Sequence, residues 1–135
     1  MYSRLDETAR AIHDARLAVS AGTPGGRETV RFDRQPIGVL LASAPNSTAV
    51  LARHVLGKVL DLPDEDRAML ITTARTWLGA AGSTSSAAKL LHLHRNTVRY
   101  RLRRLEELTG RNLAHPVDLG EIHLALEAVR ILALG

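Results

Sequence analysis

The clearest pattern of apolar and polar positions lies in residues 94–110, HRNTVRYRLRRLEELTG. At about 3.6 residues per turn, the apolar positions of this segment fall on one side of a helix. They are Val98, Leu102, Leu105 and Thr109. Outside that stripe, three arginines follow one another at intervals of four residues: Arg95, Arg99 and Arg103. The pattern predicts a helix that buries one face and presents guanidinium groups on another.

A second, shorter helix is predicted immediately before it, over residues 83–92. Its hydroxyl-rich start supplies oxygens that can cap the first backbone N–H groups. Small side chains at Ala87 and Ala88 permit the close approach of another helix. We expect Leu90 and Leu91 to supply the buried side of this helix.

A short helix, a turn at Leu93 and His94, and a basic helix form the order of a helix-turn-helix, whose second helix lies in the major groove of DNA. The charge distribution agrees with this interpretation. Residues 83–115 hold seven of the 18 Lys and Arg residues but two of the 14 Asp and Glu residues. Phosphate contacts dominate non-specific DNA affinity, so a local positive excess is the expected footprint. We therefore expect double-stranded DNA, and no membrane, as the partner.

Two helices are predicted upstream of this motif. The first is short and apolar, over residues 37–42, and the second runs to Leu60 with Asn46 or Ser47 as its cap. The periodicity of the longer helix predicts five buried side chains. They are Val50, Leu51, Val55, Leu56 and Val59.

Two more helices frame the motif on either side along the chain. One opens with Pro63 in its first turn, followed by three acids near the positive end of the helix dipole, and continues to Gly79 or Gly82. The other covers residues 117–134. Its apolar side is expected to contain Leu119, Ile122, Leu126, Val129 and Leu132 or Ala133.

The amino-terminal part of the chain predicts a further amphipathic helix over residues 2–20, ended by a loop at residues 22–26. Residues 29–32 are the sole candidate for a strand. The chain has 135 residues, 45% of them apolar, and four aromatic side chains, which favours an aliphatic, helical core. Its charged start and the lack of any apolar run of about 20 residues predict a cytoplasmic, nucleoid-associated protein.

Three segments resemble the carboxyl-terminal helix-turn-helix domain of PucR/CdaR-type bacterial transcriptional regulators. They are residues 87–91, the block LHLHRNTVRYRLRRLEELTG at 91–110, and LALEAVRI at 124–131. Upstream, VRFD at 30–33 and LARHVLGKVL at 51–60 resemble the segment that precedes this domain in the family. The resemblance implies a sequence-specific DNA-binding output domain. It also implies an all-α helical bundle that contains a Fis-like helix-turn-helix.

In that family, a sensor or other regulatory domain lies amino-terminal to the output domain. We accordingly expect residues 1–42 to be the tail of such a domain or a linker helix, and residues 43–135 to be the helix-turn-helix domain. Pro36 departs from the pattern, because a helix-friendly residue is expected there. One helix-turn-helix contacts few base pairs, so a homodimer is expected in the functional protein.

Positions along the basic helix predict the DNA contacts. The first exposed turn usually meets base edges, which assigns base contacts to Arg95, Asn96 and Arg99. Phosphate contacts are expected from side chains beside that turn: Lys89, His94, Thr97, Tyr100, Arg103 and Arg104. For Thr97, a role in helix capping or helix–helix packing remains an alternative to the phosphate contact. Arg101 is expected to pair with a glutamate such as Glu106 or Glu107, or to cover the core.

Two other classes of function remain as alternatives. An architectural or sequence-tolerant DNA-binding protein would need no base-reading pair such as Arg95 and Asn96. An enzyme or a metal-dependent module is the other. The chain has no cysteine and no catalytic motif. His92 and His94 alone are too few for a zinc site, and they are expected to end one helix and cap the next. We therefore expect no catalytic residue, metal or cofactor.

Overall fold

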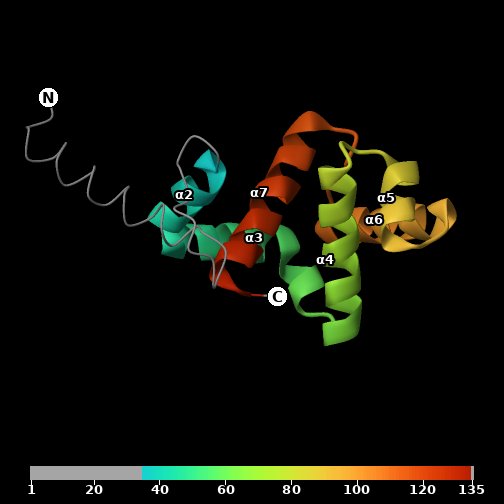
Figure 1. Cartoon of the computed structure of the whole chain (residues 1–135). Coiled ribbons are helices and arrows are strands. Elements are labelled where there is room, and N and C mark those ends of the chain that lie inside the picture. The colour runs from blue at the N-terminus through green and yellow to red at the C-terminus, as the bar shows by residue number, and fades with distance from the viewer. Residues whose placement is uncertain (1–34, 135) are drawn as a thin grey trace, which may run out of the picture.

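The computed structural model describes residues 35–134, and within that range the chain forms helices and no strand (Figure 1). The helices are α2 (Pro36–Ser43), α3 (Pro45–Leu60), α4 (Asp64–Gly79), α5 (Thr84–Leu91), α6 (Arg95–Thr109) and α7 (Pro116–Leu132). The predicted all-α class is confirmed. The helix predicted over residues 2–20, the loop at 22–26 and the candidate strand at 29–32 lie outside the described residues. None of the helices in residues 35–134 is both long and apolar enough to cross a bilayer.

The core is centred on α3 and α7, which lie against each other along most of their length (Figure 1). Leu56 from α3 and Ile122 and Leu126 from α7 are almost completely inaccessible to solvent. All three are among the positions predicted to be buried. The apolar stripes of these two helices therefore meet each other, as their periodicity requires.

Helix α2 packs on α7 and α3 and buries Val39 and Leu41. Pro36 occupies the first turn of α2, where the missing N–H of proline has no intrahelical partner to lose. Proline is thus compatible with a helix start at this position. The boundary expected between residues 42 and 43 falls near the end of α2, so residues 36–42 pack on the helical body.

Helix α4 braces the motif, because it contacts α3, α5, α6 and α7. Its Leu70 and Ile71 are buried. Arg75 also crosses from α4 to α7, where its Nη2 donates to the carbonyl oxygen of Leu126 at 3.0 Å. Burial lowers the pKa of the Arg75 guanidinium, and the nearby Glu127 carboxylate partly opposes that shift. Helix α4 therefore joins the motif to the central helix pair.

Two of the predicted helix starts were wrong in detail. Helix α3 begins at Pro45, and no side chain caps its first N–H groups, so neither Asn46 nor Ser47 is the N-cap. Proline sets the helical φ angle there without a cap. Pro63 is itself the N-cap of α4 rather than part of its first turn, which holds the three acids as predicted.

Two apolar residues predicted to be buried are exposed. Val50 is 69% exposed, because it lies on the side of α3 opposite the stripe that faces α7. Leu90 is 65% exposed. Helix α5 buries Ala87 and Ala88 and half-buries Leu91, so Leu90 is left beside that narrow stripe. Val50 thus lies outside the buried arc of α3, whereas Leu90 lies just beside the arc of α5 that the neighbouring helices cover.

Candidate nucleic-acid interface

Helix α5 is capped at both ends by hydrogen bonds between residues close in the sequence. The Ser83 hydroxyl accepts from the backbone N–H of Ser86 at 3.2 Å, which confirms the predicted hydroxyl cap. At the other end, His92 adopts a left-handed conformation with φ 56°, and the N–H of Leu93 donates to the carbonyl of Ala88 at 2.9 Å. The chain therefore reverses sharply after α5 and enters α6 after three residues.

His94 caps the start of α6, as predicted. Its backbone is extended, and its Nδ1 accepts from the N–H of Asn96 at 3.1 Å. An Nδ1 that accepts a hydrogen bond carries no proton, so Nε2 carries the proton of the neutral ring. The cap thus leaves an N–H donor on an exposed side chain at the tip of the motif.

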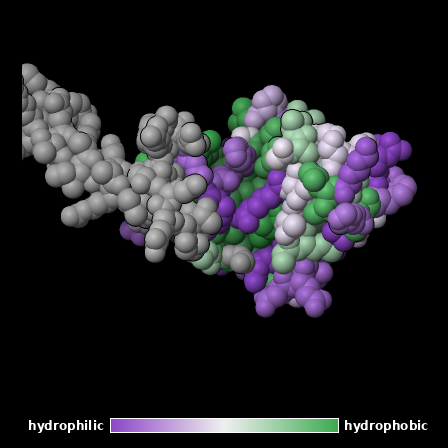
Figure 2. Space-filling model, viewed as in Figure 1, coloured by the Kyte–Doolittle hydropathy of each residue, from purple (hydrophilic) through white to green (hydrophobic). Residues whose placement is uncertain are grey.

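Helix α6 separates its two faces as predicted. Val98, Leu102 and Leu105 are buried against the core. The residues assigned to base contacts are all exposed: Arg95, Asn96 and Arg99. Hydrophilic side chains gather at the end of the molecule that α5 and α6 form (Figure 2). One side of α6 is therefore held in the core while the other is open to a partner.

The residues assigned to phosphate contacts differ in exposure. Four are exposed, namely Lys89, His94, Tyr100 and Arg103, and two are half-buried, namely Thr97 and Arg104. The cationic side chains on this surface form no ion pair with any residue in the range 35–134. They are Lys89, Arg95, Arg99, Arg103 and Arg104. Their charge is available to an anionic partner.

Arg101 faces inward instead. Its Nη1 lies 3.5 Å from the hydroxyl oxygen of Thr73 on α4, and the side chain is half-buried between the two helices. Of the two roles predicted for Arg101, the structure shows the cover over the core. The glutamate pairing was wrong, because Arg101 points toward α4 while the carboxylate of Glu106 is directed to the loop before α7.

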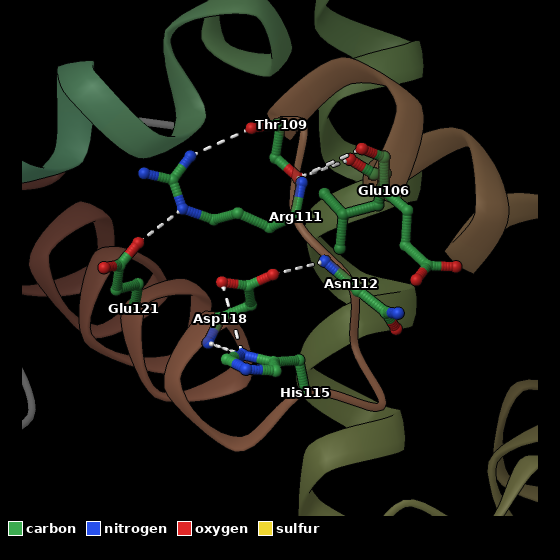
Figure 3. Close-up of polar contacts among 8 residues, drawn as sticks. Glu106, Thr109, Arg111, Asn112, His115, Asp118 and Glu121 are labelled. Atoms are coloured by element: carbon green, nitrogen blue, oxygen red, sulfur yellow. Dashed lines mark hydrogen bonds and ion pairs between the residues drawn. The ribbon is translucent and has the colours of Figure 1, made fainter.

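A polar network at the carboxyl end of α6 was not predicted (Figure 3). Glu106 accepts from the backbone N–H of Leu113 through Oε2 at 2.9 Å. Arg111 then bridges two elements: its Nε donates to Glu121 on α7 at 2.7 Å, and its Nη1 donates to the carbonyl oxygen of Thr109 at 2.9 Å. These contacts hold the end of α6 against the start of α7.

The same loop is pinned from the α7 side. Asp118 accepts from the N–H of Asn112 at 2.9 Å, and His115 caps α7 by accepting from the N–H of Asp118 at 3.4 Å (Figure 3). A proline and an acid in the first turn are known signals for a helix start. These signals are visible in the sequence, whereas the partners of Glu106 and Arg111 are not.

Within residues 35–134, no group of three or more His, Asp or Glu side chains lies close enough together to hold a metal ion.

A short helix with small buried side chains, a three-residue turn and a basic helix with an exposed polar face form the geometry of a helix-turn-helix. The family model of the PucR C-terminal helix-turn-helix domain matches residues 70–128, which run from the middle of α4 into α7. This part of the chain belongs to that family. The function class expected from the sequence is thereby confirmed: α5 and α6 form the DNA-binding helix-turn-helix found in PucR-family transcriptional regulators.

Similar curated proteins include two named regulators. The transcriptional activator PmfR of Paenarthrobacter nicotinovorans is 32% identical over 127 residues, which are 94% of this chain and 26% of PmfR. The purine catabolism regulatory protein of Bacillus subtilis is 36% identical over 78 residues, 58% of this chain and 14% of that protein. An uncharacterized protein of Thermomonospora curvata is 33% identical over 112 residues, 83% of this chain and 61% of its own length.

The chain thus spans about a quarter of PmfR and a smaller share of the purine catabolism regulator. No solved structure matches it significantly.

Removing the Glu106 carboxylate should loosen the α6–α7 connection. In Glu106→Ala the N–H of the buried Leu113 loses its acceptor, and an unsatisfied buried donor costs about 1–3 kcal/mol of the free energy of unfolding. Urea unfolding followed by circular dichroism measures this loss. Glu107→Ala is the matched control. Glu107 is exposed, and this substitution removes the same charge from the same turn of the helix. Equal unfolding free energies for the two variants would contradict the role assigned to Glu106.

Proposed function

We propose that the amino-terminal half of α6 enters the major groove and reads bases through Arg95, Asn96 and Arg99. The observation that carries this proposal is the sidedness of α6: its apolar face is buried, and these three exposed side chains lie in its first two turns. Arginine can bridge O6 and N7 of guanine, and asparagine can pair with N6 and N7 of adenine. The motif would therefore be a sequence-specific reader.

We propose further that the side chains flanking this turn bind the phosphates on either side of the groove. They are Lys89, His94, Thr97, Tyr100, Arg103 and Arg104. The cationic members form no ion pair within residues 35–134, and Nε2 of His94 offers an N–H group; both observations support this assignment. Thr97 is half-buried and makes the smallest contribution to this set.

A sequence-tolerant or architectural DNA-binding protein is the second candidate. The exposed cationic surface alone would serve it equally well, because such a protein follows the backbone. Asn96 favours the first candidate: an uncharged amide in the first exposed turn adds little to phosphate affinity and is suited to a base edge. The variants described below separate the two.

In the whole protein, we propose that this domain is the output of a homodimeric bacterial regulator that acts on the nucleoid in the cytoplasm. The curated relatives are longer than this chain, and two of them are named as regulators. Residues 1–42 would then lead from a regulatory domain or form a linker. Residues 36–42 would join that part to the helix-turn-helix body, since α2 packs directly on α7 and α3.

The base contacts predict a loss of discrimination without a loss of fold. Arg95→Ala, Asn96→Ala and Arg99→Ala should each remove about 1–3 kcal/mol of preference at one base pair, because each removes one bidentate contact. Selection of bound duplexes from a random pool, followed by titration of single base changes, measures the effect. Val98→Asp is the contrasting variant: it buries a charge, and circular dichroism should show an unfolded motif.

If all three alanine variants kept the full preference of the wild type, α6 would not be the reading helix.

The phosphate contacts predict a change in salt dependence. Arg103→Ala should weaken binding to selected and random duplexes alike and lower the slope of log affinity against log salt by about one, because one fewer counterion is released. Titrations at several salt concentrations measure the slope. Lys58→Ala is the control, since Lys58 is exposed on α3 and also unpaired. An unchanged slope for Arg103→Ala would remove Arg103 from the interface.

The dimer proposal predicts two protomers on each site. Two recognition helices on one face of DNA lie about 34–36 Å apart or at a multiple of that spacing. Sedimentation of the chain on a selected duplex should therefore give two bound protomers, and the selected sequence should contain an inverted or direct repeat. One protomer on a site without symmetry would exclude the dimer for this chain.

A further inference from the structure

A hollow of about 370 Å³ opens beside α6, bordered by α4, the start of α5 and the loop before α7. Its apolar lining includes Trp77, Leu102 and Leu113. Its polar lining consists of Thr84, Arg99, Arg103, Glu106 and Asn112. The hollow therefore combines an apolar floor with a polar rim, and two guanidinium groups of the rim belong to the helix that reads DNA.

Asn112 is held in one orientation at this rim. Its backbone N–H donates to Asp118 (Figure 3). Its side-chain oxygen accepts from the N–H of Ala114 at 2.8 Å. This bond orients the amide group, and the amide nitrogen has no acceptor among residues 35–134. An amide nitrogen carries two donors. The loop thus presents an oriented donor group at this position.

Thr84 presents a second unused donor across the hollow. Its hydroxyl forms no hydrogen bond within the part of the chain that the structure describes, although the neighbouring Ser83 and Ser86 hydroxyls bond each other at 3.0 Å. A hydroxyl, an amide and two guanidinium groups are all donors. Such a set suits an acceptor-rich anion.

Glu106 is the one acid at the rim, and it is already engaged. Its Oε2 accepts from the backbone of Leu113, so the carboxylate is directed toward the loop. Arg99 and Arg103 leave the rim with a net positive charge. A single engaged carboxylate therefore does not prevent an anion from binding among the four donors.

We propose that the DNA sugar-phosphate backbone crosses this hollow and that Asn112 and Thr84 bind one of its phosphates. The inference rests on the proposed entry of α6 into the major groove. Arg99 and Arg103 both line the hollow and lie on the reading helix, so the strand that borders the groove on that side passes over the rim. This site adds the start of α5 and the loop before α7 to the interface, outside the six phosphate-binding side chains proposed above.

Two nearly isosteric variants of the full 135-residue chain test the site. Thr84→Val removes the hydroxyl and keeps the shape. Asn112→Asp keeps the oxygen that accepts from Ala114 and removes the two donors. Each should weaken binding to selected and random duplexes by about tenfold, without a change in base preference, because hydrogen bonds to a charged group are among the stronger ones. Thermal unfolding checks that both variants keep their fold.

Matched controls carry the same chemical changes elsewhere. Thr72→Val removes an exposed hydroxyl from α4 outside the hollow, and Asn46→Asp adds a negative charge at the start of α3. Both should bind DNA as the wild type does. Losses in the controls equal to those of Thr84→Val and Asn112→Asp would overturn the proposal, since the hollow would then have no specific role.

Duplexes with a single neutral methylphosphonate identify the phosphate. At one position the substitution should weaken the wild type but cause no further loss in Thr84→Val, as expected if both changes remove the same contact. Additive losses at every position would exclude a DNA phosphate as the ligand of the hollow.

The outcome separates this site from the proposed function. If Thr84→Val and Asn112→Asp bound DNA with full affinity while Arg95→Ala lost base discrimination, only the phosphate site proposed in the hollow would be rejected. A wild-type chain without preference for any duplex would overturn the function itself.

Discussion

The burial of one face of α6 is the constraint on which the rest of this structure depends. Val98, Leu102 and Leu105 lie in the core, so the helix cannot rotate about its axis without exposing them to water. That burial decides which side chains face solvent. Arg95 and Arg103 are exposed because the three aliphatic residues hold the opposite face of the helix in the core. The DNA-binding surface is therefore a consequence of packing as much as of charge.

Both ends of α6 are held as well. At its start, the His94 ring accepts from the backbone of Asn96, and at its end, Glu106 and Arg111 join the helix to the loop and to α7. Helix α7 in turn packs along α3 and against α2. A continuous set of packed helices therefore connects the helix-turn-helix with α2, at the amino-terminal side of the described residues.

Much of the motif follows from local rules and could be predicted from the sequence. Helix periodicity depends on residues within one or two turns, and so do the Ser83 and His94 caps, which is why both caps, the apolar stripe of α6 and the exposed arginines were predicted correctly. The family resemblance rests on the same contiguous block of residues. These features need no knowledge of what lies across the core.

The tertiary structure decided everything that depends on a partner distant in the sequence. Periodicity defines an apolar arc, but the neighbouring helices decide how much of it is covered, so Leu90 beside the buried stripe of α5 is exposed although it is apolar. Arg101 contacts Thr73, 28 positions away, and not a nearby glutamate. The hollow beside α6 exists only because α4, α5 and the loop before α7 converge there. The local sequence determined the basic second helix of the motif and its charge, whereas the packing of distant segments determined the surface around it.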